Sequence, residues 1–318
     1  MQPGGDRLRV PRSMMGRGAR LALLLLWLLV LWLPGGAGAQ TPAAQTPAAQ
    51  TPGSTPVERG AYLFRAGGCY SCHTDAKGGG APLSGGRALA TPFGTFYSPN
   101  ITPDPEHGIG GWSIDDVVRA LKEGVAPDGS HYFPVFPFTS YAGMIEEDAR
   151  DIAAYLLAQP PVAQADKPHE IAFPFNQRWL QSGWKLLFFD DTTFVPDPAE
   201  STAWNRGAYL VRHLGHCGEC HTPRNALGAR IASRGLAGNP AGPDGDKVPN
   251  ITPGPDGIGG WSDDEIVELL DSGFDPDFDV VGGLMGTVVS ESTSHLTESD
   301  RRAIAVYLKS LPPLPGPD

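Results

Sequence analysis

An internal repeat constrains the fold of this chain more than any other feature of its sequence. Three blocks of residues occur twice, in the same order and about 150 positions apart. The paired blocks are residues 59–63 and 206–210, residues 100–113 and 250–262, and residues 153–156 and 305–308. The chain has 318 residues, a length that suits about two domains. We therefore predict two copies of one domain in tandem.

Each copy contains a segment that is typical of a capped amphipathic helix. In residues 113–121, a serine N-cap precedes acidic residues, and apolar residues follow at helical spacing. Residues 262–270 repeat this pattern, and Gly273 follows as the predicted end of the helix. The pattern predicts one helix after each Trp-Ser pair.

The first and last helices of each copy are predicted to pack closely together. The last helices, predicted over residues 146–157 and 297–311, each place an isoleucine and a tyrosine on one face. Gly60 and Gly207 lie in the first helices, where the absence of a side chain permits a close approach. Strand patterns are hard to find in either copy. The predicted fold class is all-α, with two small tandem domains.

The N-terminal residues are typical of an export signal. Arginines precede an apolar run over residues 21–33, and small residues follow up to Ala39. This run of 13 residues is shorter than the roughly 20 that a membrane-spanning helix needs. We predict a signal peptide over residues 1–39 and a periplasmic location for the mature protein. An uncleaved segment that anchors the protein to the membrane is the alternative.

The other boundaries follow from composition and from the repeat. Residues 40–56 repeat the sequence Gln-Thr-Pro-Ala-Ala, which predicts a disordered linker. The first domain is predicted over residues 57–160 and the second over residues 201–313. Several aromatic residues lie in the interdomain segment, residues 161–200. They predict either packing between the domains or a docking surface for a partner subunit.

All four cysteines lie in two Cys-x-x-Cys-His segments, one in each copy. This motif is the attachment signature of c-type haem. Two thiols three positions apart can form thioether bonds to the two vinyl groups of one porphyrin, and the adjacent histidine can bind the iron. A redox dithiol or a zinc site is the alternative for one such motif, but both motifs keep the histidine and the same place in the repeat. The predicted cofactors are two covalently bound haem c groups, held by Cys69, Cys72 and His73 and by Cys217, Cys220 and His221.

A second axial ligand is expected on the far side of each iron, and a methionine sulfur in that place raises the reduction potential. Met285 lies 24 residues after Trp261, in the loop before the last helix, and is the predicted ligand in the second copy. The corresponding residue of the first copy is Phe136, which cannot bind iron. Met144, His131 and an open coordination site are the alternatives there.

The charge of the chain disfavours one class of function. The formal net charge is −11. A nucleic-acid-binding protein needs a positive surface to meet the phosphates, so this class is disfavoured. An acidic surface can instead steer the encounter with a basic face of a partner protein.

The motifs resemble those of the cytochrome c subunits of membrane-bound alcohol dehydrogenase and gluconate 2-dehydrogenase. The resemblance rests on the blocks that begin at Asn100 and Asn250 and on residues 136–141 and 179–189, and it covers nearly all of residues 57–313. It implies tandem cytochrome c domains that relay electrons from a dehydrogenase subunit towards quinone or a terminal oxidase. Members of this family typically carry three haems and have a methionine where this chain has Phe136.

The sequence thus predicts an electron-transfer protein that passes electrons from a periplasmic dehydrogenase towards the respiratory chain, with no catalysis of its own. Its expected partners are redox proteins, namely a dehydrogenase subunit and a quinone-linked protein or oxidase. The alternative is a dihaem enzyme, peroxidase-like or thiosulfate-oxidising, in which the first haem has an open site. Phe136 favours this alternative. Against it, the first copy shows no acid and arginine arrangement that is typical of peroxide chemistry.

Overall fold

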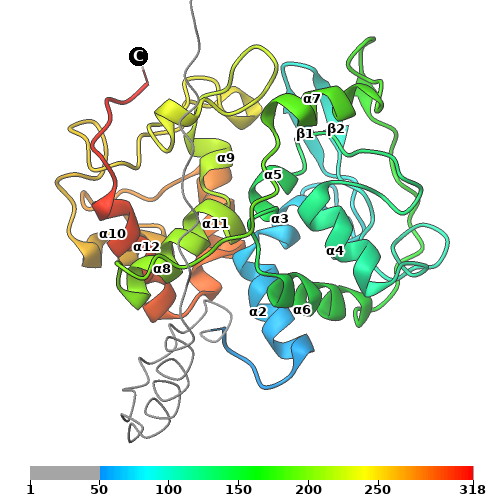
Figure 1. Ribbon diagram of the computed structural model, residues 1–318, viewed down its shortest axis with the longest axis horizontal. Helices are drawn as coiled ribbons and strands as arrows, with labels where there is room; N and C mark the ends of the chain where they lie inside the picture. The colour runs from blue at the N-terminus through cyan, green and yellow to red at the C-terminus, as the bar shows by residue number, and fades with distance from the viewer. Residues whose placement is uncertain (1–50, 318) are drawn as a thin grey trace, which may run out of the picture. The chain divides into compact units, whose positions relative to one another are not determined.

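A computed structural model describes residues 51–317 of the chain (Figure 1). These residues all belong to one compact unit. The predicted signal peptide, residues 1–39, and most of the predicted linker, residues 40–56, lie outside the described residues. At the end of that linker, Thr51 is buried, and its hydroxyl lies 3.5 Å from a guanidinium nitrogen of Arg206.

Most of the regular structure is helical (Figure 1). The helices of the first copy are α2 (Pro56–Ala66), α3 (Cys69–His73), α4 (Ile114–Glu123), α5 (Phe138–Tyr141) and α6 (Glu146–Leu157), and α7 (Leu180–Phe188) follows between the copies. The helices of the second copy are α8 (Thr202–Tyr209), α9 (Gly218–His221), α10 (Asp263–Ser272), α11 (Gly283–Glu291) and α12 (Glu298–Ser310). Short turns of other helix types are η2 (Leu210–Leu214), η3 (Ala232–Arg234), η4 (Pro243–Gly245) and η5 (Thr293–His295).

The predicted capped helices are present as α4 and α10. Ser113 accepts a hydrogen bond from the backbone N–H of Asp116, and the Asp116 carboxylate accepts one from the Ser113 N–H. Ser262 and Glu265 form the same reciprocal cap on α10. Each cap satisfies backbone donors that the first turn of a helix leaves without partners. Gly273 ends α10 in the left-handed conformation, as its position predicts.

The first and last helices of each copy are in close contact, as the two glycines predict. A Cβ atom on Gly60 would lie 1.9 Å from the carbonyl oxygen of Asp151. A Cβ atom on Gly207 would likewise lie 1.9 Å from the carbonyl oxygen of Ala303. No side chain fits into such a space, so glycine is required for α2 to pack on α6 and for α8 to pack on α12.

One extra residue in the second copy is absorbed by a π-helical turn. Cys69 follows Arg59 by 10 positions, whereas Cys217 follows Arg206 by 11. In the first copy α2 runs to Ala66 as an α-helix, but in the second copy α8 continues as the π-helix η2. A π-helical turn holds one more residue than an α-helical turn, and such turns are frequent at functional sites.

The first copy also contains a small antiparallel sheet that the all-α prediction omitted. Strand β1 (Ala88–Thr91) pairs with β2 (Gly94–Tyr97), which pairs with β3 (Glu170–Ile171) from the segment between the copies. The strands have at most four residues, and β1 has no buried residue. Such strands lack the alternation of apolar and polar residues by which a strand is recognised in a sequence. The described fold is therefore mainly helical with one minor sheet.

The segment between the copies contacts both of them. Lys185 on α7 donates to the carbonyl oxygen of Glu123 at 2.5 Å and lies 2.9 Å from Nδ1 of His131. Trp184 donates to the carbonyl oxygen of Leu227 in the second copy at 2.9 Å. None of the residues of α7 is fully buried, and Leu186 keeps 88% of its surface exposed. The segment thus bridges the copies along their surface.

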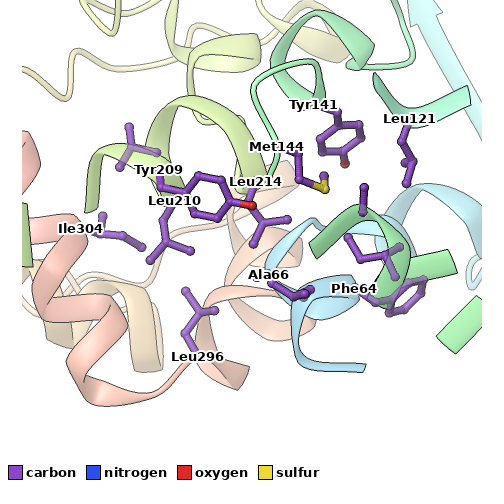
Figure 2. Close-up of a cluster of buried hydrophobic side chains, with 14 of the residues drawn as sticks. Phe64, Ala66, Leu121, Tyr141, Met144, Tyr209, Leu210, Leu214, Leu296 and Ile304 are labelled. Carbon is purple, nitrogen blue, oxygen red and sulfur yellow. The ribbon is translucent and has the colours of Figure 1, made fainter. Parts of the chain in front are cut away.

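A hydrophobic cluster joins the two copies (Figure 2). It contains buried residues of the first copy, such as Phe64 and Met144, together with residues of the second copy, such as Leu214 and Leu296. The burial of apolar surface is the main favourable contribution to folding. Because both copies supply this cluster, their hydrophobic cores are continuous. Within residues 51–317, no helix has the length and apolar character that a membrane span requires.

Candidate cofactor sites

The first Cys-x-x-Cys-His segment forms the short helix α3. Gly68 precedes it in the left-handed conformation with φ 63°, and the chain then turns into the helix. Cys69 and Cys72 are three positions apart, so they lie on the same side of this turn. Burial and the neighbouring Cys72 raise the pKa of Cys69 to about 12, and burial also raises the pKa of Cys72. Both thiols are free of disulfide bonds.

The second segment repeats this arrangement around α9. Cys217 directly precedes the helix, and Cys220 lies within it. Burial is the main cause that raises the pKa of Cys217 to about 12 and that of Cys220 to about 11. Both thiols are again free of disulfide bonds. Each copy therefore presents two neutral thiols at the spacing of the motif.

The two motif histidines are held in the same way. Nδ1 of His73 lies 2.8 Å from the carbonyl oxygen of Pro99, and Nδ1 of His221 lies 2.8 Å from the carbonyl oxygen of Pro249. A carbonyl oxygen only accepts hydrogen bonds, so Nδ1 carries the proton in both rings and Nε2 keeps a lone pair. Burial lowers the pKa of both imidazoles, which favours the neutral form. A neutral imidazole that is oriented by a carbonyl is the form that binds metals.

The repeated Asn-Ile-Thr-Pro block explains how each carbonyl is placed. The Asn100 side-chain oxygen accepts from the N–H of Thr102 at 2.9 Å and from its hydroxyl at 2.8 Å. Asn250 and Thr252 form the same pair of bonds, both at 2.8 Å. The four side chains are buried. Each block is thus a rigid turn directly after Pro99 or Pro249, which fixes the carbonyl that faces the histidine.

These residues fit the attachment of a c-type haem in both copies. Each site offers two thiols three positions apart and a neutral imidazole with Nε2 available as a ligand. In the part of the chain that the structure describes, no group of three or more His, Cys, Asp or Glu side chains is arranged to hold a metal ion. Haem needs no such group, because the porphyrin nitrogens supply the other ligands.

The loops that carry the predicted distal positions correspond between the copies. The N–H of Tyr132 donates to the carbonyl of Gly124 at 2.9 Å, and the N–H of Val281 donates to that of Gly273 at 2.9 Å. Phe136 and Met285 each lie 12 residues after these glycines. The sequence predicts a loop at Met285, but this residue lies in the first turn of the helix α11; it is half-buried and packs against the core cluster.

The other two candidate ligands of the first copy have different surroundings. Met144 has no exposed surface and lies in the hydrophobic cluster near Tyr141 and Leu214 (Figure 2). His131 is half-buried, and Lys185 lies 2.9 Å from its Nδ1. Burial and the charge of Lys185 lower the pKa of His131. Phe136 packs edge-on against the ring of Tyr141.

Sequence reasoning did not single out Glu219, which lies inside the second motif. Its side chain is buried, and its carboxylate is paired with Arg224 at 2.5 Å and with Arg230 at 3.5 Å. Burial by itself raises the pKa of Glu219, but the two arginines and the hydroxyl of Ser140 outweigh burial and lower it to about 2. A charged residue between the two cysteines of the motif is the sequence signal that could have drawn attention to it.

Comparisons with known proteins show which family the chain resembles. Residues 57–160 match the family described as Cytochrome c. Over 259 residues the chain is 50% identical to "Diheme cytochrome c-type" of Cereibacter sphaeroides. The match covers 80% of this chain and 86% of that protein.

Two other relatives are subunits of larger enzymes. The chain is 43% identical over 264 residues to "Gluconate 2-dehydrogenase cytochrome c subunit" of Pantoea cypripedii, and the match covers 80% of this chain. It is 41% identical over 292 residues to "Alcohol dehydrogenase (quinone), cytochrome c subunit" of Gluconacetobacter polyoxogenes, covering 89% of this chain. The matched regions span 59% and 60% of these relatives.

Proposed function

Because this chain belongs to the family of dihaem c-type cytochromes, we propose that it carries electrons from a periplasmic dehydrogenase towards the respiratory chain. It holds two covalently bound haem c groups, and its function is electron transfer. The dehydrogenase partner is proposed because relatives are cytochrome subunits of alcohol and gluconate dehydrogenases. The periplasmic location rests on the predicted signal over residues 1–39.

The proposed attachment residues are those of the two Cys-x-x-Cys-His segments. The carrying observation is that both histidines bind a backbone carbonyl through Nδ1 at 2.8 Å, so that Nε2 is left for iron. The cysteines beside them are free thiols at the spacing that two vinyl groups need. In this proposal Cys69 and Cys72 with His73 hold the first haem, and Cys217 and Cys220 with His221 hold the second.

The residues of the chain orient and tune the group that they hold. The haem supplies an iron that alternates between two oxidation states that differ by one electron. The carbonyl oxygens of Pro99 and Pro249 keep each imidazole in one tautomer and make it a more basic ligand. Burial lowers the pKa of both imidazoles and so favours the neutral form, which can bind iron without first losing a proton.

The distal ligands are proposed separately for the two haems. Met285 is proposed as the ligand of the second haem, and its half-buried place on α11 supports this role. For the first haem, Met144, His131 and an open site are the three proposed arrangements. Carbon monoxide binding to the reduced protein tests them, because it requires an open or weakly held site. Binding at one haem per chain would indicate such a site, and no binding would indicate a ligand at both irons.

We also propose that the chain is organised as two tandem cytochrome c domains, residues 57–160 and 201–313, joined by residues 161–200. Three features that occur once in each copy support this division: the Cys-x-x-Cys-His segment, the turn whose carbonyl oxygen faces the motif histidine, and the packed pair of first and last helices. A dihaem enzyme is not favoured, because the relatives are cytochromes and cytochrome subunits.

The decisive experiment is to produce the protein in a host that has the haem-attachment machinery. We expect two haems per chain from the pyridine haemochrome spectrum and two porphyrin adducts by mass spectrometry. Cys72→Ser and Cys220→Ser are each expected to weaken one attachment only. A chain without porphyrin adducts would refute the proposed function.

A further inference from the structure

Hydrogen bonds link the residues that lie beside the two haem-attachment segments. Nε2 of His216, the residue before the second motif, lies 3.2 Å from the carbonyl oxygen of Gly67, two residues before the first motif. The Tyr141 hydroxyl donates to the same carbonyl at 2.7 Å. His213 belongs to the π-helical turn η2, and its Nδ1 lies 3.2 Å from the carbonyl oxygen of Ser140. The extra residue of the second copy therefore lies where the two copies meet.

Glu219 is the charged member of this contact. Its Oε1 accepts a hydrogen bond from the hydroxyl of Ser140 at 2.6 Å and one from the hydroxyl of Thr139 at 3.0 Å. Both hydroxyls belong to the first copy, whereas Glu219 lies between Cys217 and Cys220. Glu219 keeps only 8% of its surface exposed.

The first motif has no matching charge. Ser71 occupies the position that corresponds to Glu219, and its hydroxyl donates to the carbonyl of Gly68 within the same copy at 2.8 Å. The two attachment segments therefore differ in the charge of the residue before their second cysteine. The difference is a buried carboxylate two residues before His221. Its partners Arg224 and Arg230 remain when the carboxylate is replaced by an amide, so that replacement leaves their positive charge without a counter-charge.

We propose that Glu219 is a positioning residue for electron transfer, which fixes the second attachment segment against the first copy and lowers the reduction potential of the second haem. The proposal rests on the proposed function, since it requires that both motifs hold haem. A negative charge near an iron favours the oxidised state, which carries one more positive charge. The effect is strong where water is excluded, because the interior screens charges less than water does.

Glu219→Gln tests the charge, and Glu106→Gln is the matched control because it removes one carboxylate from an exposed position. Spectroelectrochemical titration of the loaded protein would give the potentials of both haems. We expect Glu219→Gln to change the reduction equilibrium of the second haem about tenfold in favour of the reduced state, a rise of about 59 mV. The first haem is expected to change less, and the control to change neither.

Ser140→Ala tests the positioning part and serves as the second variant if Glu219→Gln does not fold. It leaves the carboxylate charged but removes its 2.6 Å donor. We expect the second haem's potential to fall and amide hydrogen exchange over residues 217–221 to become faster.

Two results would overturn the proposal in protein that holds two haems. One is a second-haem potential that is unchanged in Glu219→Gln, whatever its stability. The other is an unchanged potential together with unchanged exchange in Ser140→Ala. A wild-type protein with fewer than two haems would instead refute the proposed function, so the two failures are distinguishable.

Discussion

The hydroxyl of Tyr209 donates to Oδ2 of Asp148 at 2.6 Å, from the first helix of the second copy to the last helix of the first copy. Tyr62 forms the reciprocal bond with Oδ2 of Asp300 at 2.5 Å. Each phenol oxygen also accepts a backbone N–H, from Ile145 at 3.4 Å and from Thr297 at 3.1 Å. The four side chains occupy corresponding positions in the two repeats. The copies are therefore related by contacts that cross in both directions.

Tyr209→Phe is expected to lower the free energy of unfolding by about 1–3 kcal/mol, because it leaves the buried Asp148 carboxyl without its phenol donor. Urea denaturation of the loaded protein measures this change. Tyr97→Phe is the control, since Tyr97 donates to Glu170 at an exposed site and is expected to matter little. Equal effects of the two variants would contradict the importance of the crossed pair.

The stability contributed by Asp148 is expected to fall as the pH rises. Burial raises the pKa of its carboxyl to about 6, although the Tyr209 hydroxyl and Arg206 act in the opposite direction. An aspartate in an unfolded chain titrates near about 3.9. The folded state thus holds the proton more tightly, so this contribution is complete below about pH 4 and is lost as the pH rises through about 6.

Asp148→Asn separates the pH dependence of stability that is due to Asp148 from the pH dependence that is due to other titratable groups. The difference in unfolding free energy between wild type and variant is expected to change by about 2 kcal/mol between pH 4 and pH 7. Urea midpoints measured at each pH give the difference. A constant difference would show that Asp148 does not titrate in this range.

Gly207→Ala is expected to destabilise the protein strongly, because the new methyl group would lie 1.9 Å from the carbonyl oxygen of Ala303. The α8–α12 contact must open, and overpacking of this kind typically costs about 1–3 kcal/mol or more. Gly260→Ala is the matched control, since nothing lies within 4 Å of a Cβ atom there. Thermal unfolding of both variants provides the test. Equal midpoint temperatures for the two variants would contradict the close contact between α8 and α12.

Met285→Ala is expected to remove the methionine-type spectrum of one reduced haem and to leave the other unchanged. The reason is that a thioether sulfur favours the reduced state and gives a characteristic low-spin spectrum. Optical spectra of the reduced protein, with haem content measured on the same sample, provide the test. An unaltered spectrum would remove Met285 as a ligand.

Met144→Leu separates packing from ligation in the first copy. Met144 is fully buried, and leucine has a similar volume, so we expect the free energy of unfolding to change by less than about 1.5 kcal/mol. The core then stays intact, and the spectrum reports the sulfur alone. A lost methionine signal would assign Met144 to the first iron, whereas an unchanged spectrum would assign it to the core.

The local features of the fold could be predicted because short stretches of sequence determine them. Ser113 and Ser262 cap their helices through residues three positions away, and the motif histidines follow their cysteines directly. The glycines at 60 and 207 could be interpreted because a helix that lacks a side chain at one position is open to a neighbour.

Features that depend on residues far apart in the chain could not be predicted. The carbonyl that orients His73 comes from a residue 26 positions away. Asp148 and Asp300 resemble the ordinary acidic residues of a helix N-terminus, and only the packing of the copies buries them against tyrosines. Glu219 is a similar case, since its partners Thr139 and Ser140 lie in the other copy.

The crossed tyrosines have a consequence for the symmetry of the molecule. When residue i of one body meets residue j of the other, and j meets i in return, the pattern is that of a two-fold symmetric homodimer. Here both bodies are encoded in one polypeptide, so their one-to-one stoichiometry is guaranteed. Within one polypeptide the two bodies need not be identical, and they differ at corresponding positions: Met285 corresponds to Phe136, and Glu219 corresponds to Ser71.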